Sequence, residues 1–112
     1  HYWVYDATQR DIRHELFIKY GVNLVFCGHM HGYERFDVDG VVYVVDGGGG
    51  ALLYDPVGAA DMVESARPGE AAKQLAWHKS NGCTIMDVNG DGSWTLQRFE
   101  ADGGLEVDTA QS

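Results

Sequence analysis

The sequence predicts an α/β fold built around a sheet that contains a parallel pair of strands. Three observations lead to this prediction. A helical pattern over residues 9–20 runs directly into a short apolar segment at 23–27, and alternating segments flank tight turns at 39–40 and 89–92. A helix that leads into a buried strand is the second half of a β-α-β unit, whose two strands run parallel. We expect one helix and five or six strands.

The helix is predicted from apolar residues that recur every three or four positions, namely Ile12, Leu16, Phe17 and Tyr20. The hydroxyl of Thr8 can cap its first turn, and Gly21 can adopt the left-handed conformation that ends a helix. We expect Ile12, Leu16 and Phe17 to pack on the sheet, in which case Leu16→Ala would cost about 2 to 5 kcal/mol. His14 is expected at the surface.

The next strand and the first hairpin follow at once. Residues 23–27 are apolar and end at a glycine, which predicts a strand buried on both faces. Arg35–Val38 and Val41–Val45 flank Asp39-Gly40, a two-residue hairpin turn. The first five residues read as the end of an earlier strand or the loop after it.

The second half of the chain is less regular in its pattern. Residues 55–80 are polar and are expected to be irregular, with a helical turn or two at 69–75. Cys83–Val88 and Ser93–Phe99 read as a second hairpin around the turn at 89–92. These segments define a domain over residues 1–100, followed by an acidic tail over 101–112 that we expect to fray.

Composition excludes several classes of protein. The 112 residues suit one domain, and no run approaches the ~20 apolar residues of a membrane span. The net charge of −9 argues against nucleic acid as a partner, because binding to its phosphate backbone requires clustered Lys and Arg. Cys27 and Cys83 form no disulfide framework and are expected to be ordinary buried thiols.

Two histidines lie where α/β proteins place their sites. His29 and His31 follow the predicted strand 23–27, and ligands gather at the carboxyl ends of such strands. Imidazole suits zinc, iron and similar metals, and Gly28 lets the backbone turn sharply. If His1 ends the neighbouring strand, about 4.8 Å away, it can reach the metal of His29. A plain loop and an uninvolved terminus are the alternatives.

The residues around these histidines resemble a known family. Val25–Arg35 reads Val-Phe-Cys-Gly-His-Met-His-Gly-Tyr-Glu-Arg, which resembles the Gly-His-x-His-x-Tyr-Glu-Arg segment of calcineurin-like metallophosphoesterases, especially their purple-acid-phosphatase-like branch. Lys19–Val25 and Val41–Ala51 are also similar, so the likeness covers about residues 1–55. It implies that the chain is the C-terminal half of a layered β-sandwich with flanking helices.

The resemblance also implies a site and a reaction. His29 would bind one of two metal ions and His31 the other, while His1 would share the metal of His29. Tyr5 matches the tyrosine of a His-x-Pro-x-Tyr segment, although Trp3 stands where proline is usual. Two divalent or trivalent ions of zinc, iron or manganese would activate water for hydrolysis of a phosphoester substrate. No catalytic residue beyond these ligands is assigned.

Part of the family's site is missing from the sequence. Its Asp-x-His, Gly-Asp and Gly-Asn-His segments lie earlier in the chain, and none of them precedes Gly28 here. The start at His1, without a leader, suggests processing or truncation. We therefore expect a fragment, inactive alone, whose partner is the missing N-terminal half of the domain. The alternative is a non-catalytic module with a vestigial or mononuclear metal-binding loop; localisation stays open, with secreted and periplasmic relatives in the family.

Other motifs are given structural roles. Asp87–Gly92 matches the first half of a calcium-binding EF-hand loop, but position twelve is Arg98 in place of glutamate, so a hairpin turn is expected. Gly47–Gly50 lacks the lysine of a P-loop and is expected to pass close to the active site. Glu34 and Arg35 are expected to pair with each other, with Tyr33 packed over the metal loop.

Overall fold

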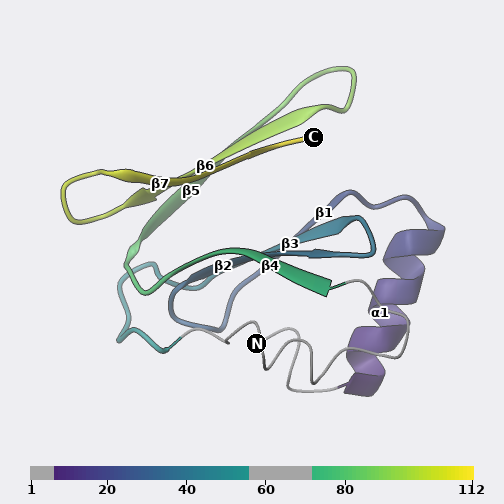
Figure 1. The fold of residues 1–112 in the computed structure, drawn as a ribbon, viewed down its shortest axis with the longest axis horizontal. Coiled ribbons are helices and arrows are strands. Elements are labelled where there is room, and N and C mark those ends of the chain that lie inside the picture. The colour runs from purple at the N-terminus through teal and green to yellow at the C-terminus, as the bar shows by residue number, and fades with distance from the viewer. Residues whose placement is uncertain (1–6, 56–71) are drawn as a thin grey trace.

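The computed structural model describes residues 7–55 and 72–112, which form two sheets and one helix (Figure 1). The helix is α1 (Ala7–Lys19). The strands in chain order are β1 (Leu24–Cys27), β2 (Tyr33–Val38), β3 (Val41–Asp46), β4 (Ala72–His78), β5 (Gly82–Val88), β6 (Trp94–Glu100) and β7 (Glu106–Gln111). His1, Trp3 and Tyr5, and most of the segment expected to be irregular, lie outside the described residues.

The strands form two layers that face each other. The larger sheet has the order β1-β3-β2-β4, in which β1 and β3 are parallel and the other pairs are antiparallel. The smaller sheet is the antiparallel β5-β6-β7. Figure 1 shows this smaller sheet on one side of the larger one. The parallel partner expected for β1, a strand that ends near His1, lies outside the described residues, and the parallel pair that the structure contains is β1 with β3. The described part of the chain is a small β-rich domain.

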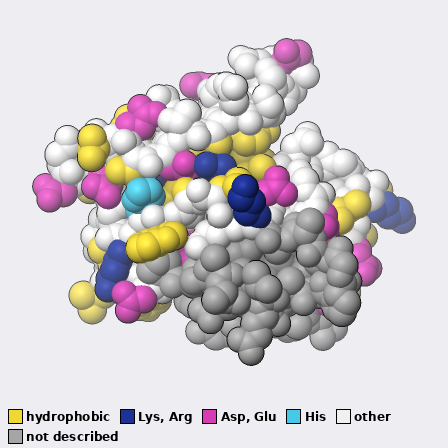
Figure 2. All heavy atoms as spheres, viewed as in Figure 1, with side chains coloured by type: hydrophobic (Ala, Val, Ile, Leu, Met, Phe, Trp, Pro, Cys, Tyr) yellow, Lys and Arg dark blue, Asp and Glu magenta, His cyan; other side chains and the backbone are white. Residues whose placement is uncertain are grey.

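Each face of the larger sheet carries its own apolar cluster. On the helix side the buried members are Met30, Phe36, Val38, Val41, Tyr43 and Val45, with Phe17 packed against them. Between the sheets lie Tyr33, Val44, Trp94 and Leu96. Apolar side chains are visible in the seam between the layers in Figure 2, with acidic side chains around them. Alternation along β2 and β3 divides their residues between the two clusters, as the period of two in a strand requires.

The helix is confirmed, but its predicted buried face is wrong. Ile12 is 51% and Leu16 45% exposed, whereas His14 is fully buried and Phe17 is half-buried. The His14 imidazole lies 2.6 Å from the hydroxyl of Tyr43 and 3.1 Å from a carboxylate oxygen of Asp39. Tyr43 and Asp39, both on the β2–β3 hairpin, give the buried imidazole the hydrogen-bonding partners that a buried polar group needs. His14 can therefore lie on the buried face of the helix, where Leu16 was expected.

The ends of the helix and the first strand also differ in detail from the prediction. The helix begins at Ala7, so Thr8 lies inside its first turn instead of capping it. Gly21 has a φ of +65°, which confirms the left-handed helix end. The strand at Leu24–Cys27 is confirmed but is not buried on both faces, because β1 is the edge of the larger sheet and Phe26 is 48% exposed.

Both predicted hairpins are confirmed. Asp39 and Gly40 have φ values of +51° and +82°, the pattern of the two-residue turn that matches strand twist. The second hairpin joins β5 and β6, and Ser93 donates its backbone N–H to Asp91 within the turn. The expectation of a turn instead of a calcium loop therefore agrees with the strands that flank it.

Two predictions about the second half of the chain are wrong. Ala72–His78 is a strand that pairs with β2, not an irregular or helical segment. Residues expected to fray include β7, which pairs with β6 along Glu106–Gln111. Both strands mix polar and apolar residues without regular alternation, so their β pattern is weak until a neighbouring strand supplies hydrogen bonds.

Candidate functional site

The segment Gly28–Gly32 crosses the end of the larger sheet, and we call it the histidine loop. It leaves β1 at one edge and enters β2 two places away, so it must pass over the end of β3. The parallel pairing of β1 and β3 brings both carboxyl ends to this point. His29 and His31 therefore lie at the carboxyl edge of the parallel strands, as the sequence predicted.

The histidine loop is built from two successive three-residue turns. The N–H of Met30 donates to the carbonyl of Gly28 at 3.0 Å, and the N–H of Gly32 donates to that of Met30 at 3.1 Å. The central residues of these turns are His29 and His31. His29 has a φ of +75°, a strained conformation for any residue with a side chain. The strain falls on His29 and not on Gly28, which has a negative φ and open space beside it, so the role given to Gly28 was wrong.

The ring of His31 is held in a defined orientation. Its Nδ1 lies 2.7 Å from the carbonyl oxygen of Leu52. A carbonyl can only accept, so Nδ1 carries a proton, and in the neutral imidazole Nε2 then keeps its lone pair. The ring stacks on Tyr54, with centroids 4.2 Å apart and planes inclined by 16°, and the N–H of Tyr54 donates to the His31 carbonyl at 2.8 Å. The tautomer and direction of His31 are thus set by residues that sequence reasoning had not singled out.

The glycine loop, Gly47–Gly50, contacts the histidine loop through Gly47. The N–H of Gly47 donates to the carbonyl of Gly32 at 3.1 Å, and a Cβ at Gly47 would lie 2.2 Å from the carbonyl oxygen of Met30. No side chain fits at that distance, so glycine is required there. The expected close passage of Gly47–Gly50 past the candidate site is confirmed at this point.

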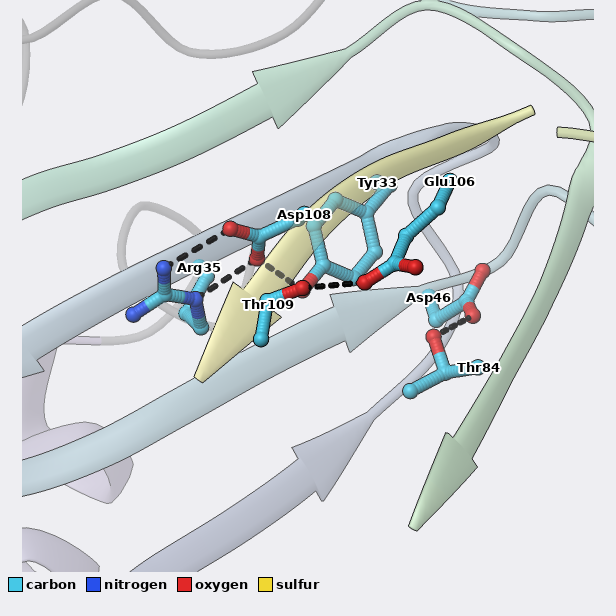
Figure 3. Close-up of polar contacts among 7 residues, drawn as sticks. All are labelled: Tyr33, Arg35, Asp46, Thr84, Glu106, Asp108 and Thr109. Carbon is cyan, nitrogen blue, oxygen red and sulfur yellow. Dashed lines mark hydrogen bonds and ion pairs between the residues drawn. The ribbon is translucent and has the colours of Figure 1, made fainter. Parts of the chain in front are cut away.

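Asp37 and Asp39 lie at the hairpin end of β2 and β3, away from the histidine loop, and Asp46 lies at the near end. All three have structural partners. Asp37 accepts the N–H of Gly40 in the hairpin turn, and Asp39 contacts His14. Asp46 accepts a hydrogen bond from Thr84 at 2.6 Å (Figure 3). Among residues 7–55 and 72–112, no group of three or more His, Cys, Asp or Glu side chains is arranged to hold a metal ion. The described residues bring together His29 and His31 on one loop, and His1 lies outside them.

Tyr33 and Arg35 have a different role from the one predicted. Arg35 forms two hydrogen bonds to Asp108 of β7, at 2.7 and 2.8 Å, and the Tyr33 hydroxyl donates to the same carboxylate at 2.6 Å (Figure 3). Glu34 points to the other face of β2 and is fully buried, so it does not pair with Arg35. The three residues Tyr33, Arg35 and Asp108 connect the two sheets.

The ionisation of this group follows from its surroundings. Burial opposes the charge on Asp108, but hydrogen bonds from Arg35 and Tyr33 outweigh it and hold the pKa of Asp108 below its usual value. Burial and the neighbouring carboxylate raise the pKa of Tyr33 well above its usual value, so its hydroxyl stays protonated. The site is therefore a fixed connection between sheets and not a source of exchangeable protons near neutrality.

The cysteines and the surface also differ in part from expectation. Cys27 is partly buried, which raises the pKa of its thiol, but Cys83 is exposed. Both are free thiols. In the part of the chain that the structure describes, no helix has the length and apolar character needed to cross a membrane.

Comparison of the chain with protein-family models, with curated proteins and with solved structures finds no match. The geometry of the histidine loop is therefore the evidence on which an assignment of function rests.

Proposed function

We propose that the chain is the C-terminal part of a metal-dependent phosphoesterase, and that His29 and His31 are metal ligands in the complete domain. The observation that carries the proposal is the orientation of His31. A metal-binding histidine almost always donates its second ring N–H to a carbonyl or carboxylate, and His31 donates Nδ1–H to Leu52. Its Nε2 is then the nitrogen available to a metal.

The conformation of His29 supports the same proposal. Positive φ at a residue with a side chain costs of order 1 to 3 kcal/mol and is concentrated at functional sites. A plain connecting loop has no need of this strain, because glycine at position 29 would remove it. His29 and His31 fit a transition metal in their chemistry, since imidazole nitrogen is a preferred ligand of zinc and iron.

The described residues supply only part of a two-metal centre. Bound ions in such a centre supply a hydroxide from water and stabilise the oxygens of the phosphoryl group. His31 contributes one oriented nitrogen, and His29 contributes a second imidazole on the same loop. Asp37, Asp39 and Asp46 have structural partners, so none of them offers a free bridging carboxylate. We infer that the remaining ligands belong to an N-terminal half of the domain.

A hollow lies at the segment that holds His31, although neither loop histidine lines it. It has a volume of about 440 Å³ and is bordered by Leu53, which lies between the two residues that hold His31. The rest of its lining consists of Lys79, Ser80, Asn81, Glu100, Ala101 and Asp102. We propose that this hollow receives the alcohol portion of the phosphoester while the phosphoryl group lies at the histidines.

The proposal is tested by metal binding and by hydrolysis. We expect the 112-residue chain to bind at most one Zn²⁺ or Mn²⁺ ion weakly in calorimetric titrations, and to lose that binding in His29→Ala and His31→Ala. His14→Gln is the control, because His14 lies on α1 and contacts Asp39 and Tyr43 of the β2–β3 hairpin instead of the loop. We also expect no appreciable hydrolysis of a chromogenic phosphate ester with added zinc, manganese or iron.

Two outcomes would contradict these expectations. Metal binding that is absent, or that survives both loop substitutions, would remove the case for a metal site. Robust metal-dependent turnover that a chelator abolishes would show that a carboxylate in this chain completes the centre. In a longer protein that contains the N-terminal motifs, His29→Ala should abolish most turnover.

A further inference from the structure

We propose that Arg98 is a positioning residue that holds the histidine loop in its metal-binding conformation. This inference rests on the proposed metal site at His29 and His31. Arg98 is far from that loop in sequence and belongs to β6 of the smaller sheet. Arg98 is connected to the histidine loop through the glycine loop, Gly47–Gly50. Every contact in this connection joins residues that the structure describes.

The guanidinium of Arg98 lies buried where three segments meet. Arg98 is fully buried, and it donates to the carbonyl oxygens of Phe99 at 2.8 Å and Ser80 at 3.2 Å. Its Nη2 lies 3.6 Å from a carboxylate oxygen of Asp46, which ends β3. The guanidinium carbon lies 5.3 Å from the ring centre of Tyr33, which begins β2. Arg98 therefore contacts the end of β3, which leads into the glycine loop, and the start of β2, which follows the histidine loop.

Two glycines close the backbone around this guanidinium. A Cβ at Gly82 would lie 2.1 Å from Nη1, and one at Gly48 would lie 3.4 Å from Nη2. The N–H of Gly82 donates to the carbonyl of Gly48 at 2.9 Å, so the two backbone segments are hydrogen-bonded to each other next to the guanidinium of Arg98. The position of Gly48 is thus determined by Arg98 and by the link between β4 and β5.

The glycine loop in turn supports the histidine loop. Gly47 lies between Asp46 and Gly48, and its N–H donates a hydrogen bond to the carbonyl oxygen of Gly32. Its backbone lies so close to Met30 that a single added carbon would clash. Met30 separates the two histidines and is fully buried. Because packed interiors transmit small displacements, a shift of Gly47 moves the turns that present His29 and His31.

Arginine is the residue type that these contacts require. Its planar fork reaches two carbonyl oxygens and approaches a carboxylate at the same time, and lysine cannot reproduce this set of directions. A buried charge is costly, so a residue that served only to fill space would be apolar. The carboxylate of Asp46 compensates the charge, and Thr84 orients that carboxylate by donating to its other oxygen (Figure 3).

The experiment compares Arg98→Lys with Arg35→Lys. Both arginines connect the sheets, but Arg35 binds Asp108 and makes none of the glycine-loop contacts described above. We would titrate each chain with Zn²⁺ by calorimetry, measure its Tm, and record backbone amide shifts of residues 29–31 without metal. We expect both variants to lower Tm. Arg98→Lys alone should weaken Zn²⁺ binding by about tenfold or more, the usual effect of losing a residue that orients a metal ligand. It should also change the chemical shifts of the three backbone amides.

A second variant covers the case in which Arg98→Lys fails to fold. Thr84→Val keeps the volume and every charge but removes the bond that orients Asp46 toward Arg98. It should weaken Zn²⁺ binding in the same direction by a smaller factor. Equal Zn²⁺ affinity in Arg98→Lys and Arg35→Lys would show that Arg98 acts on stability alone. If Arg98→Lys is unfolded, unchanged affinity and amide shifts in Thr84→Val would overturn the inference. Failure of the unaltered chain to bind Zn²⁺ would instead overturn the proposed metal site.

Discussion

Asp108 joins the two sheets through a single carboxylate. Its side chain is 8% exposed and receives hydrogen bonds from Arg35 and Tyr33, which hold its pKa below the usual value. A carboxyl whose folded pKa is lowered stabilises the fold above its unfolded pKa of about 3.9, and this contribution is lost as pH falls through the folded pKa. The contact that Asp108 makes between the two sheets is therefore expected to weaken at acid pH.

We expect Asp108→Asn to reduce the free energy of unfolding by about 1.5 to 3 kcal/mol at neutral pH, the usual contribution of hydrogen bonds to a charged group. The gap between the variant and the unaltered chain should narrow below about pH 4, because Asp108 is then increasingly protonated in both folded and unfolded states. Urea unfolding at several pH values measures this gap. Asp102→Asn, in the exposed β6–β7 turn, is the control. A gap of constant size down to pH 2 would contradict the assignment.

At the scale of elements, the helix shows how a polar partner changes a buried face. His14 and Phe17 lie three residues apart and both contact Tyr43 on β3. Leu16 and Ile12 face outward although they are more apolar than histidine. Helical spacing places residues 12 and 16 on one side and 14 and 17 on another, and the hydroxyl of Tyr43 selects the second side.

We therefore expect Phe17→Ala to destabilise the chain much more than Leu16→Ala. Loss of the packed ring should cost about 2 to 4 kcal/mol, while truncation of the half-exposed Leu16 should cost less than about 1 kcal/mol. Thermal or chemical melts of the two variants make the comparison directly. Equal losses would mean that the helix lies on the sheet in the rotation first expected from the apolar spacing.

At the scale of the whole molecule, the larger sheet is open at β1. No described strand pairs with the outer edge of this strand, and Phe26 on it is half-exposed. The segment Leu24–Cys27 has no charged residue to discourage edge pairing. The helix and the turn after it also carry exposed apolar residues, namely Ile12, Leu16, Ile18 and Tyr20.

We expect this edge to cause self-association that increases with protein concentration and with salt, because salt screens the repulsion due to the net charge of −9. Phe26→Lys should reduce association by placing a charge on the edge strand. Sedimentation velocity at several concentrations and at two salt levels measures the effect. Leu52→Lys, at an exposed apolar residue outside the sheet, is the control. A monomer at all concentrations, or equal reduction by both variants, would contradict this role of β1.

The sequence by itself determined the elements whose information is local. The spacing from Ile12 to Tyr20 and Gly21 predicted α1, and Asp39-Gly40 predicted a turn whose positive φ values are present. The pattern of helix followed by apolar strand predicted β1, and with it the strand end that carries His29 and His31, while the parallel pairing of β1 with β3 was not predicted. These predictions succeed because backbone conformation and chain direction follow from neighbouring residues.

Only the tertiary structure decided which residues meet across the chain. Ala72–His78 and Glu106–Gln111 become strands because β2 and β6 supply hydrogen bonds that their own sequences do not announce. Arg98 follows Trp94 and Leu96 at alternating positions, so the strand period placed it inside, but its partners Ser80 and Asp46 lie 18 or more residues away. The orientation of His31 likewise depends on Leu52, 21 residues distant. Contacts of this kind follow from the packing of sheets and loops, and local sequence patterns carry no record of them.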